Sequence, residues 1–195
     1  RLVSDWSSDV CSSDLSAPDL KDFASREWLA GILDPARVDG PDYFGGTRFK
    51  EGKMVRFVKR TVAQHGEAEK AQLQLVIKAV SAEAALPRQK ELDARELADI
   101  EAGRRAITTE AMRCTECHEF RKPDENDTAP LLTGYGSRKW LIDFIADPAP
   151  AQFYGRRNDR MPAYRASGIL TEAEMGILAD WLRSDWYEPG PHKAP

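Results

Sequence analysis

The chain has 195 residues, of which 42% are hydrophobic and 31% charged, with a formal net charge of -4 at pH 7. This length is enough for one or two small hydrophobic cores. The sequence has no basic stripe of the kind that binds nucleic acid, no run of 18 apolar residues that could span a membrane, and no signal-peptide pattern. We therefore expect a globular chain of one or two domains.

Residues 1–15 stand apart from the rest of the chain. The string DWSSDVCSSDL, from Asp5 to Leu15, corresponds codon for codon to the translation of a common sequencing-library adapter. We interpret residues 1–15 as an adapter-derived artefact or a disordered tail, and we assign no function to Cys11. Because the chain opens on Arg1, we also expect its natural start to be missing.

An internal repeat relates the two halves of the sequence. Residues 16–35, SAPDLKDFASREWLAGILDP, match residues 128–148, TAPLLTGYGSRKWLIDFIADP. Each copy continues through an aromatic-glycine turn to a methionine, Met54 or Met161, and then into a segment with helical periodicity. The pattern predicts a truncated first copy over 16–84, a charged linker over 85–92, a complete domain over 93–187 and a tail over 188–195.

The helical signals in this chain are periodic apolar stripes. The first copy closes with a predicted helix over 66–84, and a second predicted helix covers 93–112, just ahead of a cysteine motif. The segment 119–168 contains five prolines and is predicted to be rich in loops.

The last predicted helix begins with a capping box formed by Thr171 and Glu174, with Leu170 and Met175 as a hydrophobic staple. Its predicted buried stripe consists of Leu178, Trp181 and Leu182.

The stretch RCTECHEF contains the candidate functional residues. A C-x-x-C-H string is the pattern of covalent haem attachment, in which Cys114 and Cys117 would form thioethers and His118 would bind iron. A thioredoxin-like redox pair is an alternative, but it requires a strand before the motif and a helix after it. A zinc site is a second alternative, but no second C-x-x-C or H-x-H pattern completes a set of four ligands.

Met161 is the candidate for a sixth iron ligand on the opposite face of the haem. It lies in the polar stretch NDRMPAY, where a methionine followed by proline is a poor core signature. A thioether ligand stabilises ferrous iron. The alternatives are that Met161 fills core space, or that His192 in the carboxyl-terminal tail is the ligand.

Residues 93–187 resemble a class I cytochrome c domain. The resemblance rests on the helix with Gly103 and Ile107, C-T-E-C-H, APLLTGYGSRKW, RMPAY and a last helix with an aromatic residue. It implies an all-α fold around one covalent haem c, with Gly103 and Ile107 crossing the last helix near Trp181. The spacing from Gly103 to Cys114 exceeds the family pattern, so we expect a bulge or an extra turn there.

The same resemblance implies roles for further residues. The carbonyl of Pro130 would accept a hydrogen bond from His118, and Arg138 and Trp140 would bond a haem propionate. Tyr135 and Tyr164 would line the haem pocket. For Tyr135 and Trp140 plain core packing is the alternative, and for Arg138 a solvated surface charge.

The tandem arrangement is similar to the cytochrome c portions fused behind cytochrome b in bacterial quinol:cytochrome c oxidoreductases. This implies one-electron transfer rather than enzymatic catalysis, and a location on the periplasmic side of the inner membrane. The implied partners are cytochrome b and an iron-sulfur protein upstream and an oxidase or soluble cytochrome downstream, with membrane association through the missing upstream region. A haem peroxidase or a haem-based sensor is the alternative.

The first copy has no attachment motif, so it cannot hold a covalent haem in this chain. Met54 is the counterpart of Met161 and is expected to be a relic, or a ligand only in the intact parent. Because the first copy lacks a haem to pack around, we expect residues 16–84 to be partly disordered or loosely docked.

Overall fold

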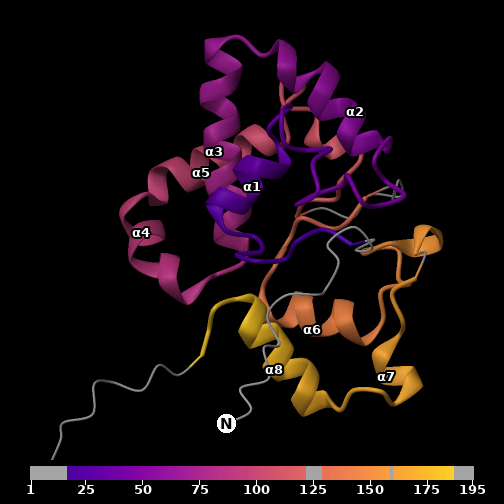
Figure 1. The fold of residues 1–195 in the computed structure, drawn as a ribbon. Coiled ribbons are helices and arrows are strands. Elements are labelled where there is room, and N and C mark those ends of the chain that lie inside the picture. Colours follow the sequence, from indigo (N-terminus) through magenta and orange to yellow (C-terminus); the bar gives the residue numbers. More distant parts are fainter. Residues whose placement is uncertain (1–16, 122–128, 159, 187–195) are drawn as a thin grey trace, which may run out of the picture. The chain divides into compact units, whose positions relative to one another are not determined.

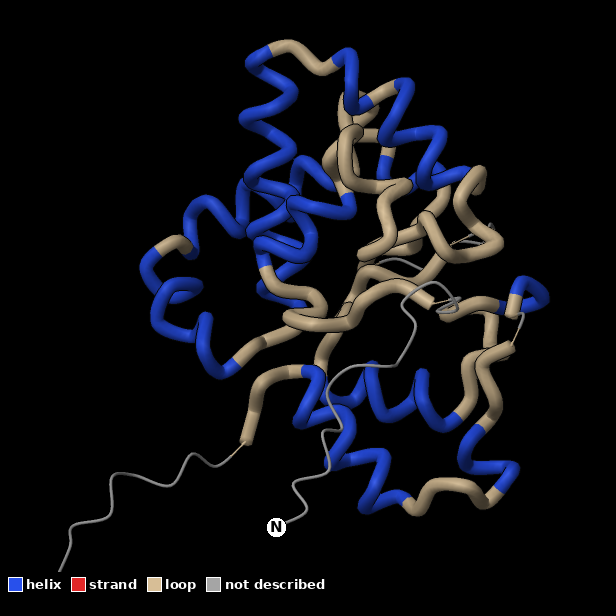
Figure 2. Tube along the Cα trace, viewed as in Figure 1, coloured by secondary structure: helices blue, strands red, loops and turns tan. Residues whose placement is uncertain are grey.

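The computed structural model describes residues 17–121, 129–158 and 160–186. Within these ranges the chain contains helices and loops and no strand (Figure 2), which confirms the predicted all-α class. The predictions for residues 1–15, with Cys11, and for the tail 188–195, with His192, lie outside the described residues.

The described helices, in chain order, are α1 (Arg26–Ile32), α2 (Lys53–Arg60), α3 (Glu67–Glu83), α4 (Lys90–Arg95), α5 (Leu97–Ile107), α6 (Arg138–Ala146), α7 (Tyr164–Ser167) and α8 (Glu172–Leu182). None of these helices is long and apolar enough to cross a bilayer. The prediction for 66–84 is confirmed by α3. The predicted linker over 85–92 instead contains a 3₁₀ turn at Pro87–Gln89 and the start of α4.

The predicted single helix over 93–112 is wrong in both extent and continuity. The chain breaks at Glu96, whose φ of -106° and ψ of 25° lie outside the helical region, so α4 and α5 are separate. Helix α5 ends at Ile107, and residues 108–112 form turns. These turns are the extra turn that the spacing between Gly103 and Cys114 predicts.

The chain divides into two compact units that do not follow the two copies of the repeat. Among the described residues, the smaller unit contains residues 17–20 and 31–65, and the larger contains residues 21–30 and those from Gly66 onward. In the smaller unit, Val38, Tyr43 and Val58 are buried, and Tyr43 packs against Gly31. The site residues predicted from the sequence all belong to the larger unit.

Helix α5 packs along α3 in the larger unit (Figure 1), and this is its most extensive helix pairing. Gly103 lies at the contact: a Cβ added there would stand 1.9 Å from the carbonyl oxygen of Leu75 and 2.8 Å from the Cβ of Ala79. Ile107, one helical turn further along α5, is fully buried. The prediction that Gly103 and Ile107 cross the last helix is therefore wrong, since α3 of the first copy is the partner.

Helix α8 packs against α6 instead. Its capping box is present as predicted: Thr171 Oγ1 accepts from the N–H of Glu174, and the Glu174 carboxylate accepts from the N–H of Thr171 at 2.8 Å. Leu170 packs against the apolar cluster that contains Met175, in line with the predicted staple. The predicted buried stripe is wrong for Trp181, which is 63% exposed, and for Leu178, which is 38% exposed, whereas Leu182 packs against the cluster that contains Met175.

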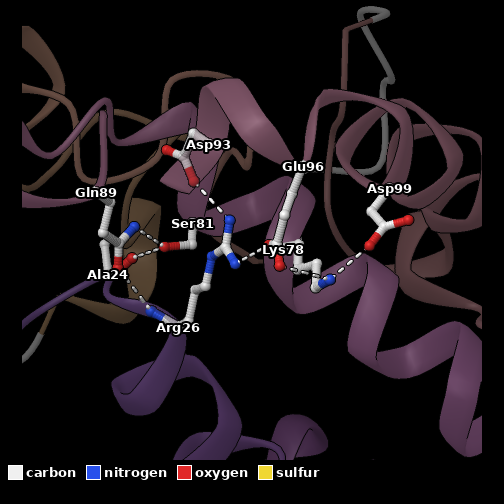
Figure 3. A network of polar contacts seen from close by, with 8 residues as sticks. All are labelled: Ala24, Arg26, Lys78, Ser81, Gln89, Asp93, Glu96 and Asp99. Atoms are coloured by element: carbon white, nitrogen blue, oxygen red, sulfur yellow. Dashed lines mark hydrogen bonds and ion pairs between the residues drawn. The ribbon is translucent and has the colours of Figure 1, made fainter. Parts of the chain in front are cut away.

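Residues of the first copy are held in the larger unit by a polar network (Figure 3). Arg26, at the start of α1, bonds Asp93 at 2.7 Å and also Glu96. Lys78 of α3 bonds Asp99 at 2.6 Å and Glu96 at 3.3 Å. Hydrogen bonding to Arg26 holds the pKa of Glu96 below its ordinary value.

A second set of contacts ties the first copy down through buried groups. Ser81 donates to the carbonyl of Ala24 at 3.0 Å and accepts from Gln89 at 2.7 Å. Phe23 and Trp28 are both less than a tenth exposed. The expectation of a loosely docked first copy is therefore wrong for residues 21–30 and for α3, because these residues pack into the same unit as the complete copy.

The two copies of the repeat adopt the same local structure ahead of α1 and α6. Asp22 and Ala24 have φ values of 58° and 60°, and their counterparts Gly134 and Gly136 have 66° and 72°. Glycine takes this left-handed conformation freely, whereas other residues pay about 1–2 kcal/mol. The first copy therefore keeps the backbone of the second at a steric cost.

The helix starts and ring contacts also match between copies. Ser25 accepts from the N–H of Trp28 at 3.1 Å, and Ser137 accepts from the N–H of Trp140 at 3.2 Å. The ring centroids of Phe23 and Trp28 lie 4.7 Å apart, and those of Tyr135 and Trp140 lie 5.0 Å apart. The repeat read from the sequence is therefore also a structural repeat.

We predict that Gly103→Ala destabilises the chain by about 1–3 kcal/mol, because the new methyl group must push α5 away from the backbone of α3. The matched control is Gly176→Ala in α8, whose added Cβ meets only the flexible end of Arg138, at 2.9 Å. The control should be neutral or stabilising by up to about 1 kcal/mol. Urea unfolding followed by circular dichroism measures both, and equal stability of the two variants would contradict the α3–α5 crossing.

Candidate functional site

The cysteine motif follows directly from the end of α5. The turn after α5 buries Met112, which is 1% exposed, and Arg113 then takes a left-handed conformation with φ of 54°. Arg113 is fixed in this position by two bonds from its guanidinium to Glu116, at 2.7 and 2.8 Å. This ion pair raises the pKa of Arg113 and lowers that of Glu116.

Cys114, Thr115 and Glu116 form a 3₁₀ turn that brings the motif onto one short loop. The carbonyl of Cys114 accepts from the N–H of Cys117 at 3.3 Å and from the N–H of His118 at 3.0 Å. The two thiols are partly buried and are not joined by a disulfide. The turn thus holds the two thiols and the imidazole on adjoining residues of one tight loop.

The ring of His118 is oriented by the backbone of the second copy. Its Nδ1 lies 2.7 Å from the carbonyl oxygen of Pro130, as predicted. A carbonyl only accepts, so Nδ1 carries the proton and Nε2 keeps its lone pair. Burial lowers the pKa of His118 and outweighs the opposite effect of this hydrogen bond. The imidazole is therefore neutral near pH 7, with one nitrogen free to bind a metal.

An aromatic cluster lies in the same unit. It consists of Phe23, Trp28, Tyr135, Trp140, Phe144, Phe153 and Tyr154, with neighbouring ring centroids 4.7–6.2 Å apart. Burial raises the pKa of Tyr135, with a contribution from Tyr154. Tyr135 and Trp140 were predicted from the sequence as site residues. Phe23 and Trp28, which belong to the first copy, were not predicted to join them.

The indole N–H of Trp140 is the unusual atom of this cluster. Trp140 is 8% exposed, and its Nε1 is buried with no hydrogen-bond partner among the described residues. A buried donor without an acceptor costs about 1–3 kcal/mol. An acceptor group of a ligand, such as a carboxylate, would satisfy it.

The remaining predicted residues lie on other contacts. Arg138 is 52% exposed and forms a bidentate pair with Asp180 of α8, at 2.7 and 3.0 Å, which raises the pKa of Arg138. Met161 and Tyr164 pack against a small apolar cluster formed by Ile145, Ala146 and Met175. Arg138 thus has a protein partner, and Met161 has the contacts that the core-filling alternative implies.

The structure also bears on the two alternatives to haem. Among the described residues, no group of three or more His, Cys, Asp or Glu side chains is placed to hold a metal ion. Burial raises the pKa of Cys114 to about 11, whereas redox-active cysteines have lowered values that favour the thiolate. Helix α5 precedes the motif, and no strand lies in the described part of the chain. The raised pKa of Cys114 and the helix ahead of the motif disfavour a redox pair.

Comparisons of this chain with protein-family models, with curated proteins and with solved structures gave no match.

We predict that Cys114 of the haem-free chain reacts slowly with iodoacetamide. With a pKa of about 11, its thiolate fraction at pH 8 is on the order of a hundredfold below that of a free cysteine, and the rate should rise about tenfold per pH unit up to that pKa. Alkylation is followed by mass spectrometry in a Cys11→Ser, Cys117→Ser background, with the urea-unfolded chain as control. A folded chain that reacts as fast as the unfolded one would contradict the burial of this thiol.

Proposed function

We propose that this chain is a one-electron carrier that holds a single covalent haem c through Cys114, Cys117 and His118. The observation that carries the proposal is the hydrogen bond from His118 Nδ1 to Pro130, which leaves Nε2 available beside the two thiols of a C-x-x-C-H motif. This combination matches what attachment and axial ligation of haem require. The fold proposed for residues 93–187 is a variant of a class I cytochrome c domain, in which α3 of the first copy packs on α5 in place of the last helix.

The residues present fit a haem group. The two thiols are not joined by a disulfide and lie on one turn with His118, and the unpartnered N–H of Trp140 is a donor for a propionate. Arg138 fits that role less well, since Asp180 already occupies its guanidinium. When bound, the haem supplies an iron that cycles between ferric and ferrous and so carries one electron.

The role of the protein in such transfer is to hold, orient and shield. Cys114 and Cys117 would anchor one edge of the macrocycle, and His118 would ligate iron in an orientation fixed by Pro130. The aromatic cluster, with Tyr135 among its rings, lowers the polarity of its surroundings and limits the access of water. Low polarity and the basicity of the axial histidine are two of the properties through which a protein sets the reduction potential.

Met161 remains the proposed sixth ligand, with Tyr164 beside it in the chain region that would face the haem. A second candidate function is supported by the contacts of Met161 with the cluster of Ile145, Ala146 and Met175. If Met161 stays in that cluster, the sixth position is open and reaction with peroxide or binding of a small molecule becomes feasible. The ligation state separates a carrier from a peroxidase or a sensor.

The proposed setting follows from the resemblance to tandem cytochrome c domains. We place the chain on the periplasmic side of a bacterial inner membrane, as part of a quinol:cytochrome c oxidoreductase. Its partners there would be cytochrome b and an iron-sulfur protein on the donor side, and an oxidase or a soluble cytochrome on the acceptor side.

The test is an absorption spectrum of the chain expressed with a c-type haem maturation system, first oxidised and then reduced with dithionite. We expect haem that stays attached under denaturing conditions in the wild type and is lost from the Cys114→Ala, Cys117→Ala variant. In the control variant Cys11→Ser, haem should stay attached under denaturing conditions as in the wild type. A wild-type preparation without covalent haem would overturn the proposal.

The same preparation tests the sixth ligand. Ligation of ferric haem iron by methionine gives a weak absorption band in the far red. Met161→Ala should abolish this band and allow carbon monoxide to bind the reduced form, because a thioether ligand has been removed. Met112→Leu, which changes a fully buried methionine outside the proposed ligand set, is the control. A high-spin wild type that already binds carbon monoxide would favour the peroxidase or sensor function instead.

A further inference from the structure

Glu83 is the last residue of α3 and belongs to the first copy, which has no attachment motif of its own. Its side chain is only 8% exposed, although it is charged. Carboxylates this buried are kept only where ion pairs and hydrogen bonds compensate for lost water. The residues that pair with Glu83 therefore indicate which segments its carboxylate stabilises.

These partners come from both sides of the His118–Pro130 hydrogen bond. Glu83 Oε1 accepts from Arg121 at 2.8 Å, and Oε2 accepts from the backbone N–H of Gly134 at 3.1 Å. Arg121 lies three residues after His118, and Gly134 lies four residues after Pro130. One carboxylate of α3 thus bridges the two segments that carry the axial histidine and its acceptor.

The two segments are also bonded to each other between these points. The N–H of Leu132 donates to the carbonyl of Glu119 at 3.0 Å, and the N–H of Arg121 donates to Thr133 Oγ1 at 2.7 Å. These bonds form a short ladder over residues 118–121 and 130–134. The His118–Pro130 bond stands at one end of the ladder, and Glu83 closes the other end.

A third partner connects this ladder to the α3–α5 pair. Arg104 of α5 approaches Glu83 Oε1 at 3.2 Å and also bonds Glu101 of its own helix. Without the charge on Glu83, Arg104 and Arg121 would face each other with no anion between them. The carboxylate of Glu83 therefore adds to the bonds that hold the two segments together.

We infer that Glu83 is a positioning residue for the axial histidine, so that α3 of the first copy is a working part of the haem site of the second copy. The inference rests on the proposed haem function. A tight ladder keeps the bond from His118 to Pro130 short, which makes the imidazole more basic and stabilises ferric iron. Loosening the ladder should shift the equilibrium toward the ferrous form.

The experiment compares the reduction potentials of the wild-type haem protein, Glu83→Gln and Arg121→Ala. Positioning predicts a rise in both variants, of about tenfold in the ferric-ferrous equilibrium, or about 59 mV for one electron. A purely coulombic effect predicts opposite signs, because one variant removes a negative charge and the other a positive one. Opposite signs, or no shift in either variant, would overturn the inference.

Glu101→Gln is the matched control, since it removes a carboxylate that pairs with the same Arg104 but touches neither segment of the ladder. Its potential should stay near that of the wild type. Amide hydrogen exchange in the haem-free chain provides a second measurement. The Leu132 N–H should exchange faster in Glu83→Gln and Arg121→Ala, and unchanged exchange there would also overturn the inference.

The failure of this inference is distinct from the failure of the proposed function. If the wild type holds no covalent haem, the proposed function falls and the inference about the axial ligand falls with it. If the wild type holds haem but the variants match its potential and exchange, only the role of Glu83 is lost.

Discussion

The structure of the larger unit depends on the close approach of α5 to α3 at Gly103. Any larger residue would force the two helices apart, because the nearest atom to an added Cβ is backbone, the carbonyl oxygen of Leu75, and not a movable side chain. The C-x-x-C-H turn follows α5 after six residues, so this crossing fixes the base from which the turn is built. The end of α3 then supplies Glu83 to the segments beyond the motif.

The repeat explains why residues of the first copy, which has no attachment motif, pack with the second copy in the larger unit. The two copies meet through equivalent positions: a Cβ on Gly136 would stand 2.4 Å from the Cβ of its counterpart Ala24, and the rings of Phe23 and Tyr135 lie 5.3 Å apart. Contact between equivalent segments is the geometry of an isologous, two-fold interface. The first copy has kept this surface although it has no cysteine pair.

Buried Arg183 at the end of α8 strengthens the same junction. Its guanidinium donates to the carbonyls of Ala85 at 2.9 Å and Gly136 at 3.0 Å, and it also bonds Ala84. Burial lowers the pKa of Arg183, which shows that part of its solvation has been lost. The carbonyls at the end of α3 and at the turn before α6 are therefore satisfied by one cation from the last helix.

Local features of this fold could be predicted from the sequence, because short-range rules determine them. The helix over 66–84, the capping box at Thr171 and the bond from His118 to Pro130 each depend on residues close in the chain or on one matched motif. The start of α6 was not predicted from the sequence, because Ser137 lies in a segment whose prolines and glycines favour loops. Its side chain nevertheless caps the helix by accepting from the N–H of Trp140.

Helix pairing could not be predicted, because two closing helices compete for a single first helix. Both α3 and α8 end a copy of the repeat, and only α5 in the described residues begins one. Periodicity marks the apolar faces of α3 and α8 but does not show which of the two helices packs on α5. The close approach of Gly103 to Leu75 and Ala79 shows that it is α3. With α5 on α3, Trp181 and Ile177 of α8 stay more than 60% exposed, which is why Trp181, expected to be buried, lies at the surface. The packing of α5 on α3 also brings Glu83 to the segments around the motif. The exposed face of α8 and the carboxylate beside the candidate haem site therefore have one physical cause.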